Sequence, residues 1–304
     1  MAKFVSIGIH VPSVSVTGLA DGRAYGAFFR DVEAMGLDAI WVEDRILHPA
    51  HLADSLVLLS WAAANTQRVQ LGTAVMVLNL RQAPLVARQV STLQHLSGGR
   101  GALGVSIGGR EEEYEALGMP MDMRVTIFRH GMSALRSLLT GAPVTHPGPF
   151  FPMDGAIVRP AAQVLILIGA IAEPAIRRAG ELGDGWIMGP FGTVKEFEDG
   201  WRIAKDGARE AGKDPDDLTA GRLLYVAVDN DRARARADMT QFLHGYYGPD
   251  FDVEKHAIFG PAAEVRARLR EQVDAGISHL MLGVPSLDRN HLRRLAEDVA
   301  PDLR

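Results

Sequence analysis

The chain contains no cysteine among its 304 residues. Disulfide bonds, thiolate metal sites and cysteine nucleophiles are therefore excluded, and the expected location is a reducing one, the cytoplasm. The longest apolar run, Val164–Ala172, is far shorter than the roughly 20 residues that span a bilayer. No block of positive charge occurs, and 32 Lys and Arg against 37 Asp and Glu give a net charge of −5. A nucleic-acid or membrane partner is therefore not expected.

The composition that is present is that of a globular protein, with 47% hydrophobic residues and enough material for a large core. The first apolar run, Phe4–Val11, contains His10 and lacks a cationic leader. It predicts a first strand rather than a signal peptide.

Short apolar runs alternate with longer segments of helical period, which is typical of parallel βα units. The predicted strands are Phe4–Val11, Ala39–Val42, Val69–Val77, Ala102–Ile107, Val164–Ile168, Trp186–Met188, Leu223–Val228 and His279–Val284. The predicted helices are Tyr25–Met35, Leu52–Asn65, Pro84–Leu96, Arg124–Leu139, Glu173–Leu182, Val194–Ala211, Arg232–Gly245, Asn290–Val299 and an additional one over Ala262–Asp274. Eight such units in roughly 250–300 residues favour a single-domain (β/α)₈ barrel over residues 1–304, rather than a doubly wound open sheet.

Two further features concern the connections. Gly36, Gly183 and Gly276 each lie between a predicted helix and a polar residue that precedes the next strand, which predicts a left-handed turn at each glycine. The Pro/Gly-rich stretch Gly141–Pro160 follows the fourth βα unit and places Pro147-Gly148-Pro149 between two short apolar pairs. It predicts a β-hairpin insertion.

In such a barrel the chemistry lies at the C-terminal ends of the strands. His10 ends the first predicted strand and could act as an acid, a base or a hydrogen-bond donor, or simply be a hydrogen-bonded loop residue.

The second strand runs into Glu43-Asp44-Arg45. Asp44 could accept a hydrogen bond from a bound ring or orient Arg45, and Arg45 could stabilise negative charge on that ring. The alternative is an Asp–Arg pair that closes the barrel rim.

His48 and His51 follow this strand closely. With His10 they leave a metal-dependent barrel hydrolase as an alternative, but no convincing third ligand accompanies the pair and no metal is expected.

Small residues dominate the next three strand ends. Gly72-Thr73-Ala74-Val75 in the third strand would let a flat ligand approach the backbone. Ser106-Ile107-Gly108-Gly109 after the fourth exposes backbone N–H groups to a ring or phosphate, although it is not a Gly-x-Gly-x-x-Gly fingerprint. Gly169-Ala170 in the fifth precedes a helix that begins near Pro174, and the positive end of that helix would suit a phosphate.

The chain resembles the bacterial-luciferase-like oxidoreductases, which include flavin-dependent monooxygenases and enzymes that use the deazaflavin coenzyme F420. The stretches that carry the resemblance are Leu71–Val75, Pro84–Arg100, Glu113–Pro120 and Ala179–Trp186. The resemblance implies a barrel with an insertion, a cofactor ring across the barrel mouth, and a phosphate near the fourth and fifth strand ends. It also implies a non-proline cis peptide bond at Ala74–Val75.

The chain departs from the family pattern at three positions. Arg45 replaces a histidine common in many members, Gly109 stands where some deazaflavin members carry a glutamate, and Ala170 replaces a second glycine. These departures leave a non-catalytic flavin-binding barrel as an alternative function.

Two cofactors fit the resemblance, F420 and FMN. F420 is favoured because Trp41–Leu47 resembles the deazaflavin branch, and it implies hydride transfer to or from a small organic substrate. The family resemblance also implies a homodimer. FMN would instead imply a monooxygenase using reduced flavin and oxygen. The predicted catalytic residues are His10, Arg45 and His48. The predicted cofactor contacts are Asp44, Thr73, Ala74, Val75, Ser106, Gly108, Gly109, Gly169 and Ala170.

Overall fold

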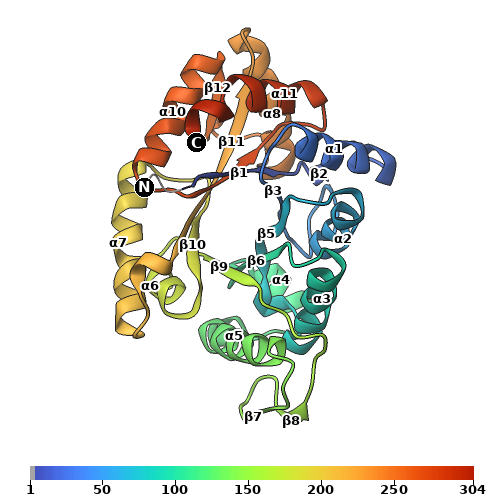
Figure 1. Cartoon of the computed structure of the whole chain (residues 1–304), viewed down its shortest axis with the longest axis vertical. Helices are drawn as coiled ribbons and strands as arrows, with labels where there is room; N and C mark the ends of the chain where they lie inside the picture. Colours follow the sequence, from blue (N-terminus) through green and yellow to red (C-terminus); the bar gives the residue numbers. More distant parts are fainter. Residues whose placement is uncertain (1–3) are drawn as a thin grey trace.

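The apolar runs form eight parallel strands that close into a barrel in a computed structural model, which describes residues 4–304 (Figure 1). The barrel strands are β1 Ser6–His10, β3 Ala39–Val42, β5 Gln70–Val77, β6 Gly101–Ser106, β9 Leu165–Gly169, β10 Gly185–Met188, β11 Thr219–Val228 and β13 His279–Gly283. They pair in the order β1-β3-β5-β6-β9-β10-β11-β13, and β13 returns to β1. The predicted (β/α)₈ barrel is thereby confirmed.

Helices cover the outside of this barrel (Figure 1). They are α1 Gly22–Ala34, α2 Ser55–Asn65, α3 Ala83–Leu96, α5 Arg124–Leu139, α6 Glu173–Leu182, α7 Val194–Glu210, α8 Arg232–Tyr247, α10 Ala262–Asp274 and α11 Arg289–Asp298, with the shorter α4 Glu111–Ala116 and α9 Val253–His256. The 3₁₀ turns are η1 Leu78–Leu80, η2 Met121–Met123, η3 Pro215–Asp217 and η4 Ala300–Leu303. Side-chain caps fix several starts, as at Asp54 before α2 and Thr193 before α7. Within residues 4–304 no helix is long and apolar enough to cross a membrane.

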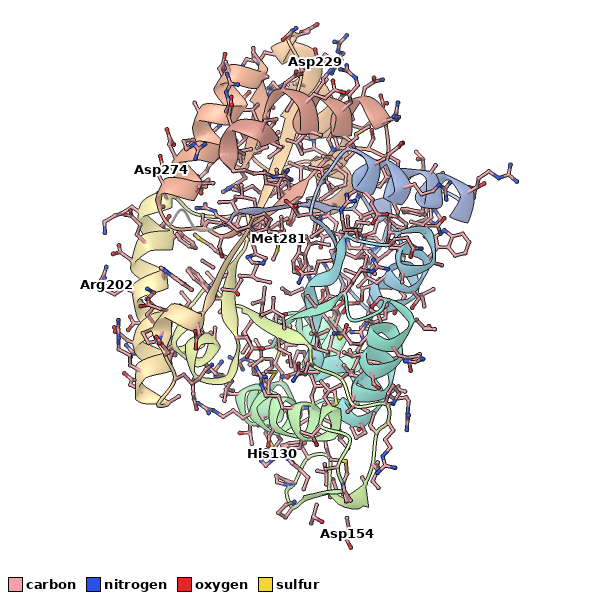
Figure 2. The ribbon with its side chains drawn as sticks, in the orientation of Figure 1. His130, Asp154, Arg202, Asp229, Asp274 and Met281 are labelled. Carbon is pink, nitrogen blue, oxygen red and sulfur yellow. The ribbon has the colours of Figure 1, made fainter. Side chains whose placement is uncertain are left out.

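Trp41 of β3 lies in the barrel interior and is fully buried. A Cβ atom on Gly8 would lie 2.5 Å from Trp41 Nε1, and one on Gly72 would lie 2.2 Å from Trp41 Cζ3. The neighbouring strands therefore need glycine where the indole passes between them. Met281 of β13 is buried in the same cluster, at the centre of the view in Figure 2, so the barrel is packed rather than open as a pore.

The three glycine junctions are not alike. Gly36 and Gly276 have φ of 77° and 98°, the left-handed conformation predicted for them. Gly183 instead has φ of −94°, so that prediction is wrong. Glycine is required at position 183 because the Ala179 carbonyl oxygen lies too close to allow a side chain: a Cβ atom would be 2.8 Å from it.

The insertion after the fourth unit forms an antiparallel hairpin between β7 Val144–His146 and β8 Met153–Ala156. Its second strand begins after Phe150-Phe151, because Phe151 takes a positive φ of 55° and belongs to the turn. Figure 2 shows Asp154 at this end of the molecule, far from Asp229 at the opposite end.

Strand β5 is irregular where its small residues lie. The peptide bond between Ala74 and Val75 is cis, as the family resemblance implied, and the register with β6 shifts between Thr73 and Met76. The features that were not predicted include α4, α9, the strand β12 Ala257–Gly260 along the C-terminal part of β11, and a small antiparallel pair of β2 Val14–Ser15 with β4 His51–Leu52.

Candidate active site

A cavity of about 510 Å³ opens at the C-terminal ends of the barrel strands. His10, Val77, Ser106 and Gly169 each line it and are each the last residue of their strand. The remaining lining residues are Glu43, Asp44, Ala74, Val75, Ile107, Gly108, Gly109, Ala170, Ile171, Ala172, Ala175, Ile187, Gly189, Pro190, Phe191, Leu223, Tyr225, Tyr246 and Tyr247. Its size lies within the roughly 300–1,000 Å³ of small-molecule sites.

His10 has two polar atoms without partners. Its side chain is 1% exposed, and within residues 4–304 neither ring nitrogen makes a hydrogen bond of good geometry, although the Ala74 main chain lies close to the ring. Burial lowers the pKa of His10 to about 4, against a smaller opposing effect of the Ala74 main chain. The imidazole is therefore neutral near pH 7. Because buried polar atoms are nearly always hydrogen-bonded, these nitrogens point to a ligand.

Glu43 is the second buried polar group of the cavity. It follows β3, is 5% exposed, and accepts a 2.7 Å hydrogen bond at Oε1 from the Ser13 hydroxyl. Burial raises the pKa of Glu43 to about 7, while Ser13 and Arg45 oppose the rise. A carboxyl group near half-ionisation at neutral pH is typical of functional sites.

Tyrosines form the wall beside Glu43. The hydroxyl groups of Tyr225 on β11 and Tyr247 at the end of α8 lie 2.8 Å apart, and the Tyr246 and Tyr247 rings meet edge to face. Burial, followed by weaker effects that include the Glu43 charge, raises the pKa of Tyr247 to about 12. These phenols keep their protons near neutral pH and can donate hydrogen bonds.

Asp44 lines the cavity, but its oxygens are already engaged. Arg81 donates to both of them at 2.7 and 2.8 Å, Ser55 donates to Oδ1 and the Val77 main chain to Oδ2. Burial raises the pKa of Asp44, and Arg81 is the strongest opposing influence. The two-fold guanidinium contact is the geometry of an ionised carboxylate. Asp44 is thus paired with Arg81 and not with Arg45.

Arg45 and His48 lie outside this cavity, in a neighbouring groove that shares the wall of Tyr246 and Tyr247. Arg45 Nε is 3.3 Å from Glu113 Oε1. That oxygen also accepts the main-chain N–H groups of Ile46 and Leu47, so Glu113 fixes the loop that carries Arg45.

Both ring nitrogens of His48 are occupied. Nδ1 accepts from the Ala50 main chain, so Nε2 carries the proton and donates to the Tyr246 carbonyl oxygen at 3.2 Å. The ring also stacks on Tyr246. The structure therefore gives His48 a role in holding the end of α8 and leaves neither nitrogen free for proton transfer.

The glycines at the rim divide into two kinds. Gly108 has φ of 74°, and a Cβ atom there would lie 2.6 Å from Val77 Cγ1. A Cβ atom on Gly109 would meet nothing within 4 Å, so Gly109 keeps space open at the cavity edge. Thr73 does not line the cavity; it is fully buried and its hydroxyl donates to the Gly104 carbonyl oxygen.

Of the predicted site residues, the cavity brings together all except Arg45, His48 and Thr73. Sequence reasoning missed Glu43, Tyr225, Tyr246 and Tyr247 as site residues. The break from apolar to charged residues at Glu43 was visible, but nothing local showed that tyrosines of β11 and α8 would bury it. Across residues 4–304 no group of three or more His, Asp or Glu side chains is placed to hold a metal ion.

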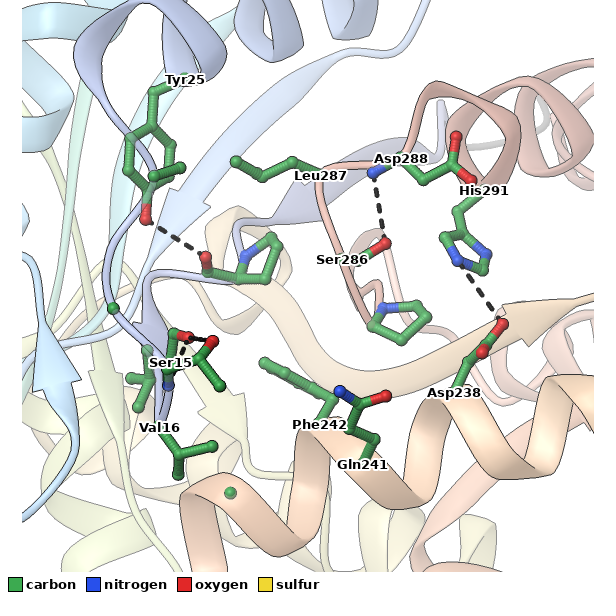
Figure 3. Close-up of a pocket in the computed structure, with 17 residues that line it drawn as sticks. Ser15, Val16, Tyr25, Asp238, Gln241, Phe242, Ser286, Leu287, Asp288 and His291 are labelled. Atoms are coloured by element: carbon green, nitrogen blue, oxygen red, sulfur yellow. Dashed lines mark hydrogen bonds and ion pairs between the residues drawn. The ribbon is translucent and has the colours of Figure 1, made fainter.

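A second cavity of about 430 Å³ lies beside β2, α8 and α11 (Figure 3). Within it, Tyr25 donates to the Pro12 carbonyl oxygen, His291 Nε2 lies 3.8 Å from an Asp238 carboxylate oxygen, and the Asp288 main chain donates to Ser286. His291 Nδ1 is buried without a partner among the described residues. This cavity lies away from the strand ends, where the chemistry of such barrels is found, and we therefore place the candidate active site at the barrel mouth.

Comparison with known sequences gives relatives along most of the chain. The sequence is 30% identical to the F420-dependent glucose-6-phosphate dehydrogenase of Beutenbergia cavernae over 309 positions, which cover 90% of each chain. It is 29% identical to the 5,10-methylenetetrahydromethanopterin reductase of Methanolobus tindarius over 236 residues, covering 76% of this chain and 70% of the relative.

Solved structures share the fold. An F420-dependent secondary alcohol dehydrogenase in complex with an F420-acetone adduct superposes with a TM-score of 0.85 at 21% identity, covering 99% of both chains. The oxygenating constituent of 3,6-diketocamphane monooxygenase from Pseudomonas putida, in complex with FMN, gives 0.81 at 15% identity with the same coverage. The profile of the luciferase-like monooxygenase family matches residues 2–248, and the chain therefore belongs to that family.

Proposed function

We propose that the protein is an oxidoreductase that uses the deazaflavin coenzyme F420 to transfer a hydride to or from a small organic substrate. The observation that carries this proposal is His10, whose two unpartnered nitrogens lie in a largely apolar cavity at the strand ends. The F420-dependent relatives support the choice of cofactor.

The residues present fit a flat ring with polar edges. Ala74, Val75 and Ile187 offer apolar surface, and the Gly109 edge has no side chain to obstruct it. The imidazole N–H of His10 can donate to a ring atom and its other nitrogen can accept. Asp44 contributes through its ion pair with Arg81, which fixes the loop after β3 beside the ring.

An anionic tail would find its partners at the fifth strand end. Gly169, Ala170 and Ala172 line the cavity next to the start of α6. The first N–H groups of a helix lack intrahelical partners, and the helix dipole favours an anion there.

When bound, F420 supplies two-electron hydride chemistry, and the chain supplies binding, orientation and protection from water. The tyrosine wall excludes solvent from one side of the cavity, and Arg45 places a positive charge behind it. Because the cofactor supplies the redox chemistry and the chain supplies binding and orientation, the site can be mostly apolar, with few polar groups.

The test is a titration of the purified protein with F420 and, separately, with FMN, followed by absorbance and fluorescence. Saturable binding of F420 with weaker or no binding of FMN supports the proposal. Binding of FMN alone would replace it with the flavin monooxygenase alternative. Binding of either without turnover of any substrate would favour the non-catalytic barrel.

We also propose a homodimer located in the cytoplasm. Val57 and Trp61, one turn apart on α2, are 70% and 45% exposed, and Leu85 on α3 is 56% exposed; exposed apolar patches are typical of interaction surfaces. Sedimentation of the wild type and of Val57→Glu tests the dimer: a lighter species for the variant supports it, and a monomeric wild type contradicts it. The lack of cysteine agrees with a reducing compartment.

A further inference from the structure

We propose that Glu43 is the proton-exchanging residue of the cavity, the side chain that gives a proton to a substrate oxygen during reduction and takes it back during oxidation. This inference rests on the proposed F420 function and names a residue for the proton that must accompany the hydride. None of the residues predicted as catalytic from the sequence fills this role.

The geometry places a buried carboxyl group at the cavity. Glu43 lines the cavity at the end of β3 and is 5% exposed. Among the described residues, Ser13 is the one residue that donates hydrogen bonds to it: its hydroxyl donates to Oε1, and its main chain also stabilises the carboxylate. The loop after β1 thus holds the carboxyl group where it lines the cavity.

Titratable and charged groups face Glu43 from each neighbouring element. On its own strand end Arg45 stabilises the carboxylate and Asp44 opposes it. The tyrosines whose pKa is raised in part by the Glu43 charge are Tyr25 of α1, Tyr225 of β11, and Tyr246 and Tyr247 of α8. His10 of β1 completes the set at the cavity. Arg45 is the one cation named among these neighbours, Asp44 carries a like charge, and the phenols are neutral. The negative charge of an ionised Glu43 is therefore only weakly compensated.

The other candidates cannot exchange a proton as readily near neutral pH. The pKa of His10 is about 4, so its imidazole stays neutral. Asp44 is ionised in the Arg81 pair, and the pKa values of the tyrosines lie above their usual range. Glu43, with a pKa of about 7, populates both the acid and the base form, which suits general acid–base catalysis.

In the reduction of a carbonyl compound, the hydride and the proton reach the substrate from different groups. The substrate carbon accepts a hydride from the reduced deazaflavin, and the electron pair of the C=O π bond moves to the oxygen. That oxygen takes the proton from Glu43, which is left as a carboxylate, and an alcohol is formed. The oxidised deazaflavin releases one proton to solvent and Glu43 regains one, so no net proton is consumed.

The test measures proton exchange without requiring a known substrate. F420 binding is followed by calorimetry at pH 7.5 in phosphate, HEPES and Tris, whose ionisation enthalpies differ, so that the slope gives the protons taken up. A bound anion that displaces water raises the pKa of a nearby carboxyl group, so the wild type takes up a fraction of a proton. Glu43→Gln is expected to bind F420 without this uptake, and Glu115→Gln, on the exposed face of α4, to retain it.

A spectroscopic readout covers the protein without cofactor. The infrared carbonyl band of a protonated carboxyl group should decline as the wild type passes from pH 6 to pH 8 and be absent from Glu43→Gln. Ser13→Ala removes a donor to the carboxylate, so its midpoint should shift upward. An unchanged midpoint in Ser13→Ala, or equal proton uptake by wild type and Glu43→Gln, would overturn the role of Glu43 and leave the F420 function standing. Absence of F420 binding by the wild type would overturn both.

Discussion

Arg81 reaches from the loop after β5 and donates to both carboxylate oxygens of Asp44, at 2.7 and 2.8 Å, across the space between two strand ends. The Asp44 side chain is 1% exposed and the Arg81 side chain 13%. The residue that the family resemblance marks as a cofactor neighbour is thus also the anchor that joins the loops after β3 and β5.

Replacement of Asp44 by alanine should therefore lower stability as well as cofactor affinity. Removing one partner of a buried ion pair leaves the other charge uncompensated and costs about 3 kcal/mol or more. Urea unfolding of Asp44→Ala, Arg81→Met and the double variant measures this cost. The double variant should be more stable than Asp44→Ala alone, and a strictly additive result would show that the pair has no coupling.

The pKa of Glu43 predicts a pH-dependent stability difference between the wild type and Glu43→Gln. Since the folded state keeps its proton up to about pH 7 while the unfolded chain loses it near 4.5, the unfolded chain binds fewer protons between these values. Wild-type stability therefore falls as pH rises through that window and levels off above it. At about 1.4 kcal/mol per pKa unit, the full difference is about 3 kcal/mol.

Glu43→Gln does not titrate, so its stability relative to the wild type should increase between pH 4 and pH 8. Denaturant unfolding at both pH values isolates this term, because all other groups are shared. A relative stability that does not change with pH would contradict the buried, weakly compensated carboxyl group. The expected gain at pH 8 also means that a carboxylate here costs stability, as at many functional sites.

The two rim glycines provide a matched pair of substitutions. Gly108→Ala should destabilise the fold, because its positive φ and the 2.6 Å approach to Val77 leave no place for a methyl group. Gly109→Ala should leave the melting temperature nearly unchanged and weaken F420 binding, because its methyl group would enter open space at the cavity edge. Unaltered affinity in Gly109→Ala would place the ring elsewhere.

The regular elements could be predicted because their patterns are local. The α5 and α6 bounds and the β3 bounds follow from hydrophobic period and punctuation, and the structure has the same limits. The short strand β12, four residues long, carried too little periodicity to be recognised, and its pairing with β11 is a tertiary contact. Helix α4, six residues long, was also too short to be recognised; it begins with three glutamates one residue after Gly108-Gly109.

The site could be predicted only where strand ends alone define it. His10, Gly108 and Gly169 could be placed at the barrel mouth from the order of strands. Glu43 could not be recognised, since its burial depends on Tyr246 and Tyr247, about 200 positions later in the chain. His48 stood close in sequence to Asp44, yet its hydrogen bond to Tyr246 turns it toward the neighbouring groove.

F420 binding at the barrel mouth is tested most directly by comparing the F420 affinity of the wild type with that of His10→Phe. We expect saturable F420 binding by the wild type and a loss of affinity of roughly tenfold or more in the variant, since one lost hydrogen bond to a buried group is worth about 1–2 kcal/mol. His10→Phe should be at least as stable as the wild type because it removes two unpartnered buried nitrogens. Equal F420 affinity of the two proteins, or no binding by either, would contradict a deazaflavin seated against His10 at the barrel mouth.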